Sequence, residues 1–314
     1  MQRAIQSGKD ELAVYTFSFL LGPRINAAGR MGSAMLAYEL LTTDDKDCAA
    51  ALAAKLEGLN AERRSVEVNI LSIAREQCGI GNVPRTFGAA AVVVGGRVAE
   101  GWHPGVIGIV ASRLAEATGV PAVVIAFDDD NAGRGSVRAG VGYHAVEALQ
   151  EVSGVLQGFG GHARAAGFSL KAGCFEAFKE AFCAACERQR QKMDAGPVLP
   201  RLDGWLTADD VSLEFYLIQQ RLAPFGEGNP TPRWGIRNVV IEQARAIGQN
   251  GEHLHLMFRL DSGKNVRGIW FRHGYLAEQL LAEGGTRNVL FSLAQSVFGG
   301  ETVPEMRVCD MSMG

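Results

Sequence analysis

Between residues 87 and 192, short runs of consecutive apolar residues alternate with segments of helical periodicity, and this alternation limits the folds open to the chain. Unbroken apolar runs are typical of strands that are buried on both faces of a sheet. Helices between such strands cover those faces. We therefore predict an α/β sheet covered on both sides, with strands at 89–94, 121–127, 135–139 and 165–170 and helices at 105–117, 143–152 and 175–192.

A long helix is predicted over 44–80, because residues 42–45 (Thr-Thr-Asp-Asp) offer capping oxygens for its first turn. Its apolar residues recur in alternating steps of four and three and form one narrow stripe, which Arg63 interrupts. The members of this stripe are Leu52, Leu56, Leu59, Val66, Ile70 and Ile73. A helix with so narrow a stripe is typical of a strut between domains.

The apolar run at 12–21 has no packing partner earlier in the sequence. We interpret 1–43 as the remaining end of a domain, and we expect the run to be exposed when the chain is isolated. The run is too short to span a bilayer and no cleavage site follows it. No membrane association is therefore predicted.

A Pro- and Gly-containing linker near 195–200 separates an α/β domain at 81–195 from a last domain at 196–314. Short alternating strands in this last domain predict a small β-barrel. Leu254, Leu256, Phe258 and Leu260 fall on one side of a strand, so we expect Phe258 to lie in the barrel core. Residues 230–275 carry seven Lys or Arg against three acidic residues, although the whole chain has a formal net charge of −3.

The basic segment is interleaved with aromatic residues, which include Trp270 next to Arg272. Stacking of bases on exposed rings and attraction of the backbone by basic side chains are how OB-folds bind single strands. The alternative is that the rings fill the barrel, and for Trp270 the sequence leaves both possibilities open.

Three glycine-bearing segments in the α/β domain could bind an anion. Residues 101–108 lead into a helix, whose N–H groups and dipole favour negative charge. Arg134, Ser136 and Arg138 alternate along a strand, so they project from one face and suit a phosphate. Residues 158–167 read as a tight bend with a backbone nest. Singly, each segment could equally be an ordinary turn or a solvated strand.

The remaining candidate motifs favour structural roles. Six cysteines without a framework of spacings indicate a reducing, cytoplasmic environment. Cys183 and Cys186 fall within a predicted helix, where neither a redox pair nor a zinc site is expected. Residues 128–130 (Asp-Asp-Asp) have no matching histidine or second acidic cluster, and we interpret them as a solvated loop.

Five motifs resemble, in the same order, those of the RecJ family: LGPRINAAGRM (21–31), GWHPGVIGIVASRLAE (101–116), GRGSVRA (133–139), GFGGHARAAGFSL (158–170) and APFGEGNPTP (223–232). The middle of the chain resembles the DHHA1 domain of the DHH phosphoesterase superfamily, and the tail resembles an OB-fold. The resemblance therefore implies an α/β DHHA1-like domain, preceded by a long connecting helix and followed by a small OB-fold β-barrel.

The resemblance also implies an activity, namely that of a 5′-to-3′ exonuclease on single-stranded DNA in recombination and repair. In that family a DHH domain binds Mn²⁺ or Mg²⁺ through Asp and His residues and activates the attacking water. This sequence contains no Asp-His-His triplet. We therefore expect the family's metal ligands to precede Met1, and this chain alone to bind no metal and to leave DNA uncleaved.

Carried over residue by residue, the resemblance implies contacts with the 5′ end of the DNA. Ser136 and Arg138 would hold phosphate, and Arg24, Asn26 and Arg30 would lie at the junction with the catalytic half. The residues that would line the cleft are His103, Gly160, Gly161 and His162. Single-strand-binding protein is a possible partner.

Two other functions stay open. One is a DHH-type phosphodiesterase of short oligonucleotides or cyclic dinucleotides, against which the basic barrel argues because a small substrate does not need it. The other is a non-catalytic module that binds single strands or docks a protein partner. The missing Asp-His-His motif favours this second alternative for the chain itself.

Overall fold

A computed structural model of the protein describes residues 16–79, 88–193, 201–248 and 251–314. The chain divides into two compact units, 1–195 and 196–314. The first part of the apolar run at 12–21 lies outside the described residues. Its described end, Thr16–Leu21, is a single turn of π-helix in which Phe17 and Phe19 are 54% and 64% exposed.

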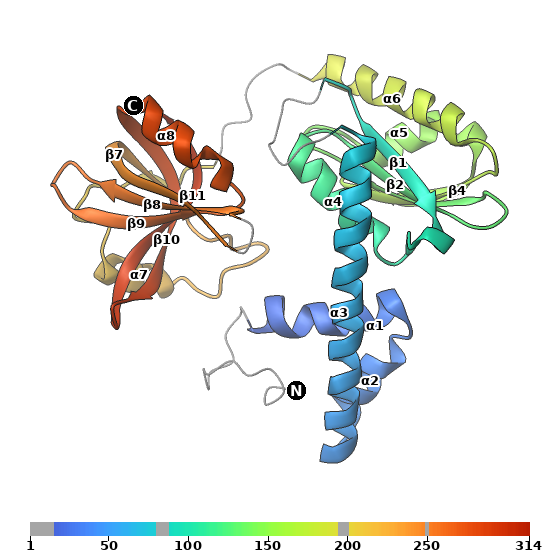
Figure 1. The fold of residues 1–314 in the computed structure, drawn as a ribbon, viewed down its shortest axis with the longest axis horizontal. Helices are drawn as coiled ribbons and strands as arrows, with labels where there is room; N and C mark the ends of the chain where they lie inside the picture. The colour runs from blue at the N-terminus through green and yellow to red at the C-terminus, as the bar shows by residue number, and fades with distance from the viewer. Residues whose placement is uncertain (1–15, 80–87, 194–200, 249–250) are drawn as a thin grey trace. The chain divides into compact units, whose positions relative to one another are not determined.

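The first unit combines a layer of helices with a sheet (Figure 1). It contains helices α1 (Gly22–Met31), α2 (Met35–Thr42), α3 (Lys46–Gln77), α4 (Ile107–Thr118), α5 (Ala145–Glu151) and α6 (Phe175–Lys192), and strands β1 (Val92–Arg97), β2 (Ala122–Phe127), β3 (Gly133–Arg138), β4 (Leu156–His162) and β5 (Ala165–Leu170). Segment 21–31, for which the sequence predicted no element, is the helix α1.

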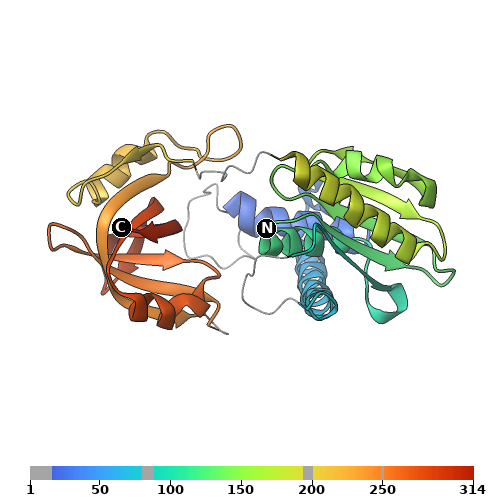
Figure 2. The same cartoon turned by 90° about the horizontal axis from the view of Figure 1, so that it is seen from above.

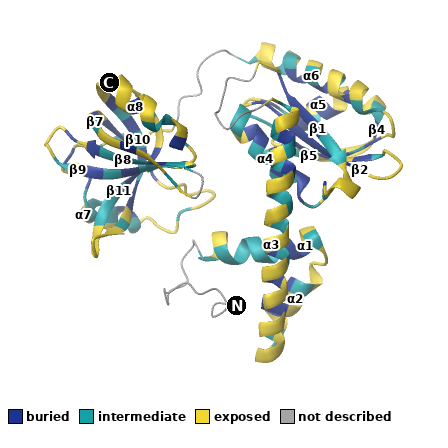
Figure 3. Cartoon of the chain, viewed as in Figure 1, coloured by how far each residue is buried: buried dark blue, intermediate teal, exposed yellow. Residues whose placement is uncertain are grey.

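The long connecting helix is confirmed as α3, and it joins two separate cores. It begins after Asp45, whose carboxylate accepts hydrogen bonds from the N–H groups of Asp47 and Cys48. Leu52 and Leu56 pack with α1 and α2, whereas Ile70 belongs to a core with β1, β2 and α4. The buried residues of α3 fall into two groups, within 52–60 and 70–74, and much of the rest of the helix is exposed (Figure 3).

The sheet has the order β1-β2-β3-β5-β4, and β1 and β2 are its parallel pair. Alternate side chains of β1 and β2 enter two different cores, one with α5 and α6 and one with α3 and α4. The helices of these two cores lie on opposite sides of the sheet (Figure 2). The predicted coverage of both faces is therefore confirmed for β1 and β2.

The prediction is wrong for the outer half of the sheet. α5 and α6 cover one side of β3, β5 and β4, and the coverage by α4 ends at β3. We call the side of these three strands that faces away from α5 and α6 the open face, where α4 lies against β3 alone of the three. The tight bend predicted at 158–167 is limited to a turn at residues 163 and 164, because β4 continues to His162 and pairs with β5 along its length. Strand pairing here overrides the low strand preference of glycine.

The second unit is the predicted small β-barrel. It contains β6 (Gly204–Trp205), α7 (Leu213–Gln220), β7 (Trp234–Ile247), β8 (His253–Arg259), β9 (Asn265–Trp270), α8 (Ala277–Glu283), β10 (Thr286–Phe298) and β11 (Glu301–Met313). Strands pair in the order β7-β8-β9-β11-β10, and β10 closes the barrel on β7. This is the Greek-key arrangement expected of an OB-fold, and Phe258 is fully buried in its core. Among the described residues of both units, no helix is long and apolar enough to cross a membrane.

The core behind the open face provides a first test. Phe178 is fully buried and its ring stacks between those of Phe168 and Phe182, at centroid distances of 4.7 and 5.4 Å. Phe178→Ala should lower the free energy of unfolding of the first unit by about 3 to 5 kcal/mol, through lost burial and a cavity. Urea denaturation followed by hydrogen exchange in α6 measures this loss. Phe159→Ala, at a position 38% exposed, is the control, and equal losses in both variants would contradict the packing described.

Candidate functional site

Three rows of residues cross β3, β5 and β4 in register on the open face. From one end of the strands to the other, the rows are Arg134, Ser169 and Gly158; then Ser136, Gly167 and Gly160; then Arg138, Ala165 and His162. The predicted alternation of Arg134, Ser136 and Arg138 is thereby confirmed. Two of the rows place glycine next to a basic or hydroxyl side chain, which leaves the sheet backbone bare beside it.

A cavity of about 870 Å³ lies over the first row, over Ser136 and Gly167 of the second row and over Arg138 of the third. Its walls come from the end of α1, the turn at 103–105 and the first turn of α4. The basic side chains among its lining residues are Arg30, His103, Arg134 and Arg138, and no lining residue is acidic. Such a hollow attracts an anion, because nothing in its lining neutralises the three guanidinium groups.

Arg138 is the most constrained of these cations. Its Nη1 donates to Ser136 Oγ at 2.9 Å and to the carbonyl oxygen of Val137 at 2.8 Å. Burial lowers the pKa of Arg138, and the nearby positive charge of Arg30 lowers this pKa further. An anion bound between the two guanidinium groups would relieve this repulsion, so the pair favours phosphate-like ligands.

The turn before α4 presents a histidine to the same cavity. His103 Nδ1 accepts a hydrogen bond from the N–H of Gly105 at 3.0 Å, so the neutral ring carries its proton on Nε2 and can donate it. Gly108, in the first turn of α4, lies against Ser136 and Arg138 of β3. A Cβ there would be 3.0 Å from Arg138 Nη2 and 3.1 Å from Ser136 Oγ. The missing side chain keeps this part of the cavity open.

The structure places the other predicted residues of this unit outside the cavity lining. Gly160 and His162 lie on the open face but beyond the lining, whereas Gly161 pairs with Ala166 and belongs to the opposite side of the sheet. At Gly161 φ is 147°, and a Cβ would press on Ala166 of β5, so this position requires glycine for packing.

Two residues of α1 are also separate from the cavity. Arg24 forms an ion pair with Glu57 of α3 and donates to the carbonyl oxygen of Leu20 at 2.7 Å. Asn26 is exposed on the same helix. Arg30 is therefore the predicted residue of α1 that reaches the lining. The sequence did not single out Gly29, Gly105 or Ser169, because they come together only through the fold.

The acidic run and the cysteine pair have structural surroundings. Asp128 Oδ1 accepts hydrogen bonds from the N–H groups of Asp130 and Ala132, at 3.1 and 2.8 Å, and closes an exposed turn. Cys186 is buried in α6, where burial raises the pKa of its thiol to about 12. Within the described ranges, no group of three or more His, Cys, Asp or Glu side chains could hold a metal ion.

In the barrel, Trp270 is half-buried on the side of β9 that faces the core. One face of its ring is covered by His273, with a centroid distance of 4.1 Å and an interplanar angle of 15°. Arg272 follows with φ of 65°, and its N–H donates to His253 Nδ1 at 3.2 Å. The core-facing position makes Trp270 a poor platform for a nucleobase.

The outer side of the barrel holds a basic cluster that includes Arg245 and Arg267, two of the seven basic residues of segment 230–275. The Arg267 guanidinium lies 4.2 Å from the Phe298 ring centroid, and its Nη2 is 3.1 Å from His255 Nε2. Arg245 pairs with His255 across the strands, and Glu305 pairs with Arg267. The alternation of β8 indicated that His255 faces outward, but the approach of Phe298 depends on the β10–β11 hairpin.

Comparison with known proteins finds both domains in this chain. Residues 88–188 match the family model of the DHHA1 domain, and residues 202–310 match that of the RecJ OB domain. The predicted order of a DHHA1-like domain followed by an OB-fold is confirmed.

Relatives extend the match to nearly the whole chain. The single-stranded-DNA-specific exonuclease RecJ of Bacillus subtilis is 30% identical over 299 residues, which are 95% of this chain and 37% of that protein. RecJ of Thermus thermophilus is 36% identical over 297 residues, which are 94% of this chain and 40% of that protein. The crystal structure of Thermus thermophilus RecJ with Mn²⁺ has a TM-score of 0.77 and 33% identity, and covers 96% of this chain and 42% of that one. The chain thus spans less than half of the length of these relatives.

The barrel cluster predicts a pH dependence. Burial, and then the charge of Arg267, lower the pKa of His255 in the folded protein. As pH falls below the ordinary histidine pKa of about 6.5, the unfolded chain binds a proton that the folded chain does not yet bind. The barrel should therefore lose stability with falling pH, and His255→Gln should reduce the loss. NMR titration of the His255 ring and urea denaturation between acidic and neutral pH measure both effects; protonation of His255 above its ordinary pKa would contradict this prediction.

Proposed function

The chain belongs to the RecJ family, and we propose that it is the part that holds single-stranded DNA by its 5′ end for exonucleolytic removal of nucleotides. In this proposal the cavity of the first unit takes the terminal phosphate, and the activity serves DNA recombination and repair. The observation that carries the proposal is the cavity's composition, with Arg30, Arg134 and Arg138 in its lining and no acidic side chain.

The open face supports an extended ligand rather than an isolated phosphate ion. Adjacent strands are about 4.8 Å apart, so the rows from β3 to β4 extend over about 10 Å. Gly167, Gly158 and Gly160 have no side chain that projects from the sheet backbone. At Gly158 and Gly160, a Cβ would have no other atom within 4 Å. A sugar or base could therefore approach the backbone closely while its phosphate is bound by Ser136 and Arg138. His162, at the far corner, would contact the next part of the strand.

The barrel supplies the support for DNA rather than a small nucleotide. On its outer side, strands β7 and β9 and the β10–β11 hairpin present Arg245, Arg267 and Phe298, a combination of charge and ring that suits a single strand. In OB-folds generally, oligonucleotides bind on the face of the second and third strands, which are β8 and β9 here, and on the neighbouring loops. A phosphodiesterase of short oligonucleotides would not need this second surface.

The family's metal chemistry does not fit the described residues of this chain. RecJ structures from Thermus thermophilus contain Mn²⁺ or Mg²⁺. Such ions prefer carboxylate oxygens, whereas the cavity lining has none, and the described residues hold no cluster of three or more metal-ligating side chains. The proposed role of this chain is therefore binding and orientation, with no step that passes through a metal ion.

Fluorescence anisotropy with labelled oligonucleotides tests the proposal. The protein should bind single-stranded DNA more tightly than duplex, and a 5′-phosphorylated strand more tightly than a 5′-hydroxyl strand. Arg138→Gln should weaken binding of the phosphorylated strand about 10- to 100-fold and abolish the preference for the 5′ phosphate, because a hydrogen bond to a charged group contributes about 1.5 to 3 kcal/mol.

The matched control is Arg188→Gln, which removes the same charge from α6 on the covered side of the sheet, where Arg188 pairs with Glu151. This variant should bind like the wild type. Equal binding of single strands and duplex, or equal binding of the two 5′ ends by the wild type, would overturn the proposed function.

A further inference from the structure

Arg30 lines the cavity from α1, and the next lining residue in the sequence, His103, follows more than seventy residues later. A contact between α1 and the sheet domain must therefore hold Arg30 at the cavity. At the contact, the backbone of Arg30 lies directly on Gly105. A Cβ at Gly105 would overlap the Arg30 carbonyl oxygen and lie 2.8 Å from its carbonyl carbon. In return, Arg30 Nη1 donates to the carbonyl oxygen of Gly105 at 3.2 Å.

A neighbouring apolar contact adds to this docking. Met31, the last residue of α1, packs against the core that contains β1, β2, α3 and α4. The end of α1 therefore touches the sheet domain through Gly105 and through Met31, as well as being connected to it through α3.

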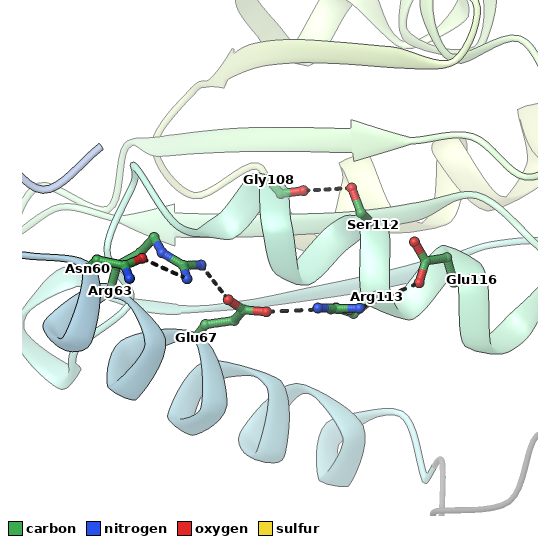
Figure 4. A network of polar contacts seen from close by, with 7 residues as sticks. All are labelled: Asn60, Arg63, Glu67, Gly108, Ser112, Arg113 and Glu116. Atoms are coloured by element: carbon green, nitrogen blue, oxygen red, sulfur yellow. Dashed lines mark hydrogen bonds and ion pairs between the residues drawn. The ribbon is translucent and has the colours of Figure 1, made fainter. Parts of the chain in front are cut away.

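The connection through α3 is fixed at its middle by a buried carboxylate (Figure 4). Glu67 accepts from Arg63 Nη1 at 2.6 Å and pairs with Arg113 Nε of α4 at 3.4 Å. Both Glu67 and Arg63 are largely buried, with side-chain exposures of 13% and 12%. In the same helix α4, Ser112 Oγ donates to the carbonyl oxygen of Gly108, the residue that lies next to the Arg138 guanidinium. This network sets how α3 lies on α4 but makes no contact with Arg30 itself.

A force opposes the docking of α1. Arg30 and Arg138 carry like charges, and the proximity of Arg30 contributes to the lowered pKa of Arg138. Docking must therefore hold the Arg30 guanidinium against repulsion until an anion neutralises the pair. The hydrogen bond from Arg30 to Gly105 and the close backbone contact are the interactions that do so at this end of α1.

We propose that Gly105 is a positioning residue: its missing side chain lets the end of α1 dock on the turn before α4, and this docking places the Arg30 guanidinium beside Arg138. The proposal rests on the proposed function, because the site that it completes is the phosphate site. Gly105 acts through Arg30 and through the approach of two backbones. Its φ is not in the left-handed region, so any substitution with a Cβ should undock α1 without straining the turn itself.

The test is a double-mutant cycle between Gly105→Ala and Arg30→Gln in the whole chain, with 5′-phosphorylated oligo(dT) as the ligand. Gly105→Ala should weaken binding about as much as Arg30→Gln, roughly tenfold for a difference of about 1.4 kcal/mol. The double variant should bind no more weakly than Arg30→Gln alone, because an undocked α1 has already withdrawn Arg30. Losses that add in the double variant would overturn the proposal, since they would show that Gly105 acts independently of Arg30.

Hydrogen exchange without ligand measures docking directly. Gly105→Ala should speed exchange in α1 and leave β2 and β5 protected, whereas Gly154→Ala, at an exposed glycine with nothing within 4 Å of its Cβ position, should change neither. If Gly105→Ala fails to fold, Met31→Ala removes the apolar docking contact without a clash and should give the same pattern. Unchanged exchange in α1 overturns the positioning role whether or not DNA binds. Selective loss of α1 protection in a protein that binds no DNA supports the docking and rejects only the proposed function.

Discussion

The one-sided packing of the outer sheet is the constraint on which the candidate site depends. The stacked rings of Phe168, Phe178 and Phe182 hold α6 against one side of the sheet. Gly135 makes room for this stack, because a Cβ there would overlap the Phe168 ring. With the core of these strands supplied from one side, their other side needs no helix. Arg134 is therefore exposed on this side, whereas Ser136 and Arg138, next to Gly108 in the first turn of α4, are half-buried.

The long helix α3 makes the first unit a composite of two cores. Its buried side is apolar toward each end and polar in the middle, where Asn60 and Arg63 lie between Leu59, which packs with α1 and α2, and Val66, which packs with the sheet domain. The interruption of the stripe at Arg63 thus marks the boundary between the two layers. The cavity draws on both of them, because Arg30 comes from the helical layer and the other lining cations come from the sheet domain.

Sequence patterns predicted the elements that depend on local periodicity. The capped helix α3, the buried strands β1 and β2, and the alternation in β3 and β8 all follow from the spacing of apolar and polar residues. Two elements of the first unit, α1 and β4, were missed because their signal is tertiary. α1 contains Pro23 and two glycines, and β4 contains three glycines, so local preference argued against a helix and a strand. Packing on α3 and pairing with β5 override that preference.

The same distinction applies to the site. The basic residues of β3 and His103 in the turn before α4 could be found from residue types. Whether Arg30 or Arg24 lines the cavity depends on which face of α1 meets the sheet domain. The orientation of Trp270 could not be predicted from the sequence, because a shift of one residue in the strand register decides whether a ring faces the core or the solvent.

The difference in burial between the two basic surfaces has a consequence for how each responds to salt. Mobile ions screen exposed charges over about 8 Å at physiological ionic strength, and they screen half-buried charges much less. Arg245 is exposed on the barrel, whereas Arg138 is half-buried and held by Ser136. Rising ionic strength should therefore weaken anion binding at the barrel surface before it weakens anion binding in the cavity of the first unit. The two units would then differ in the salt concentration at which each releases a bound polyanion.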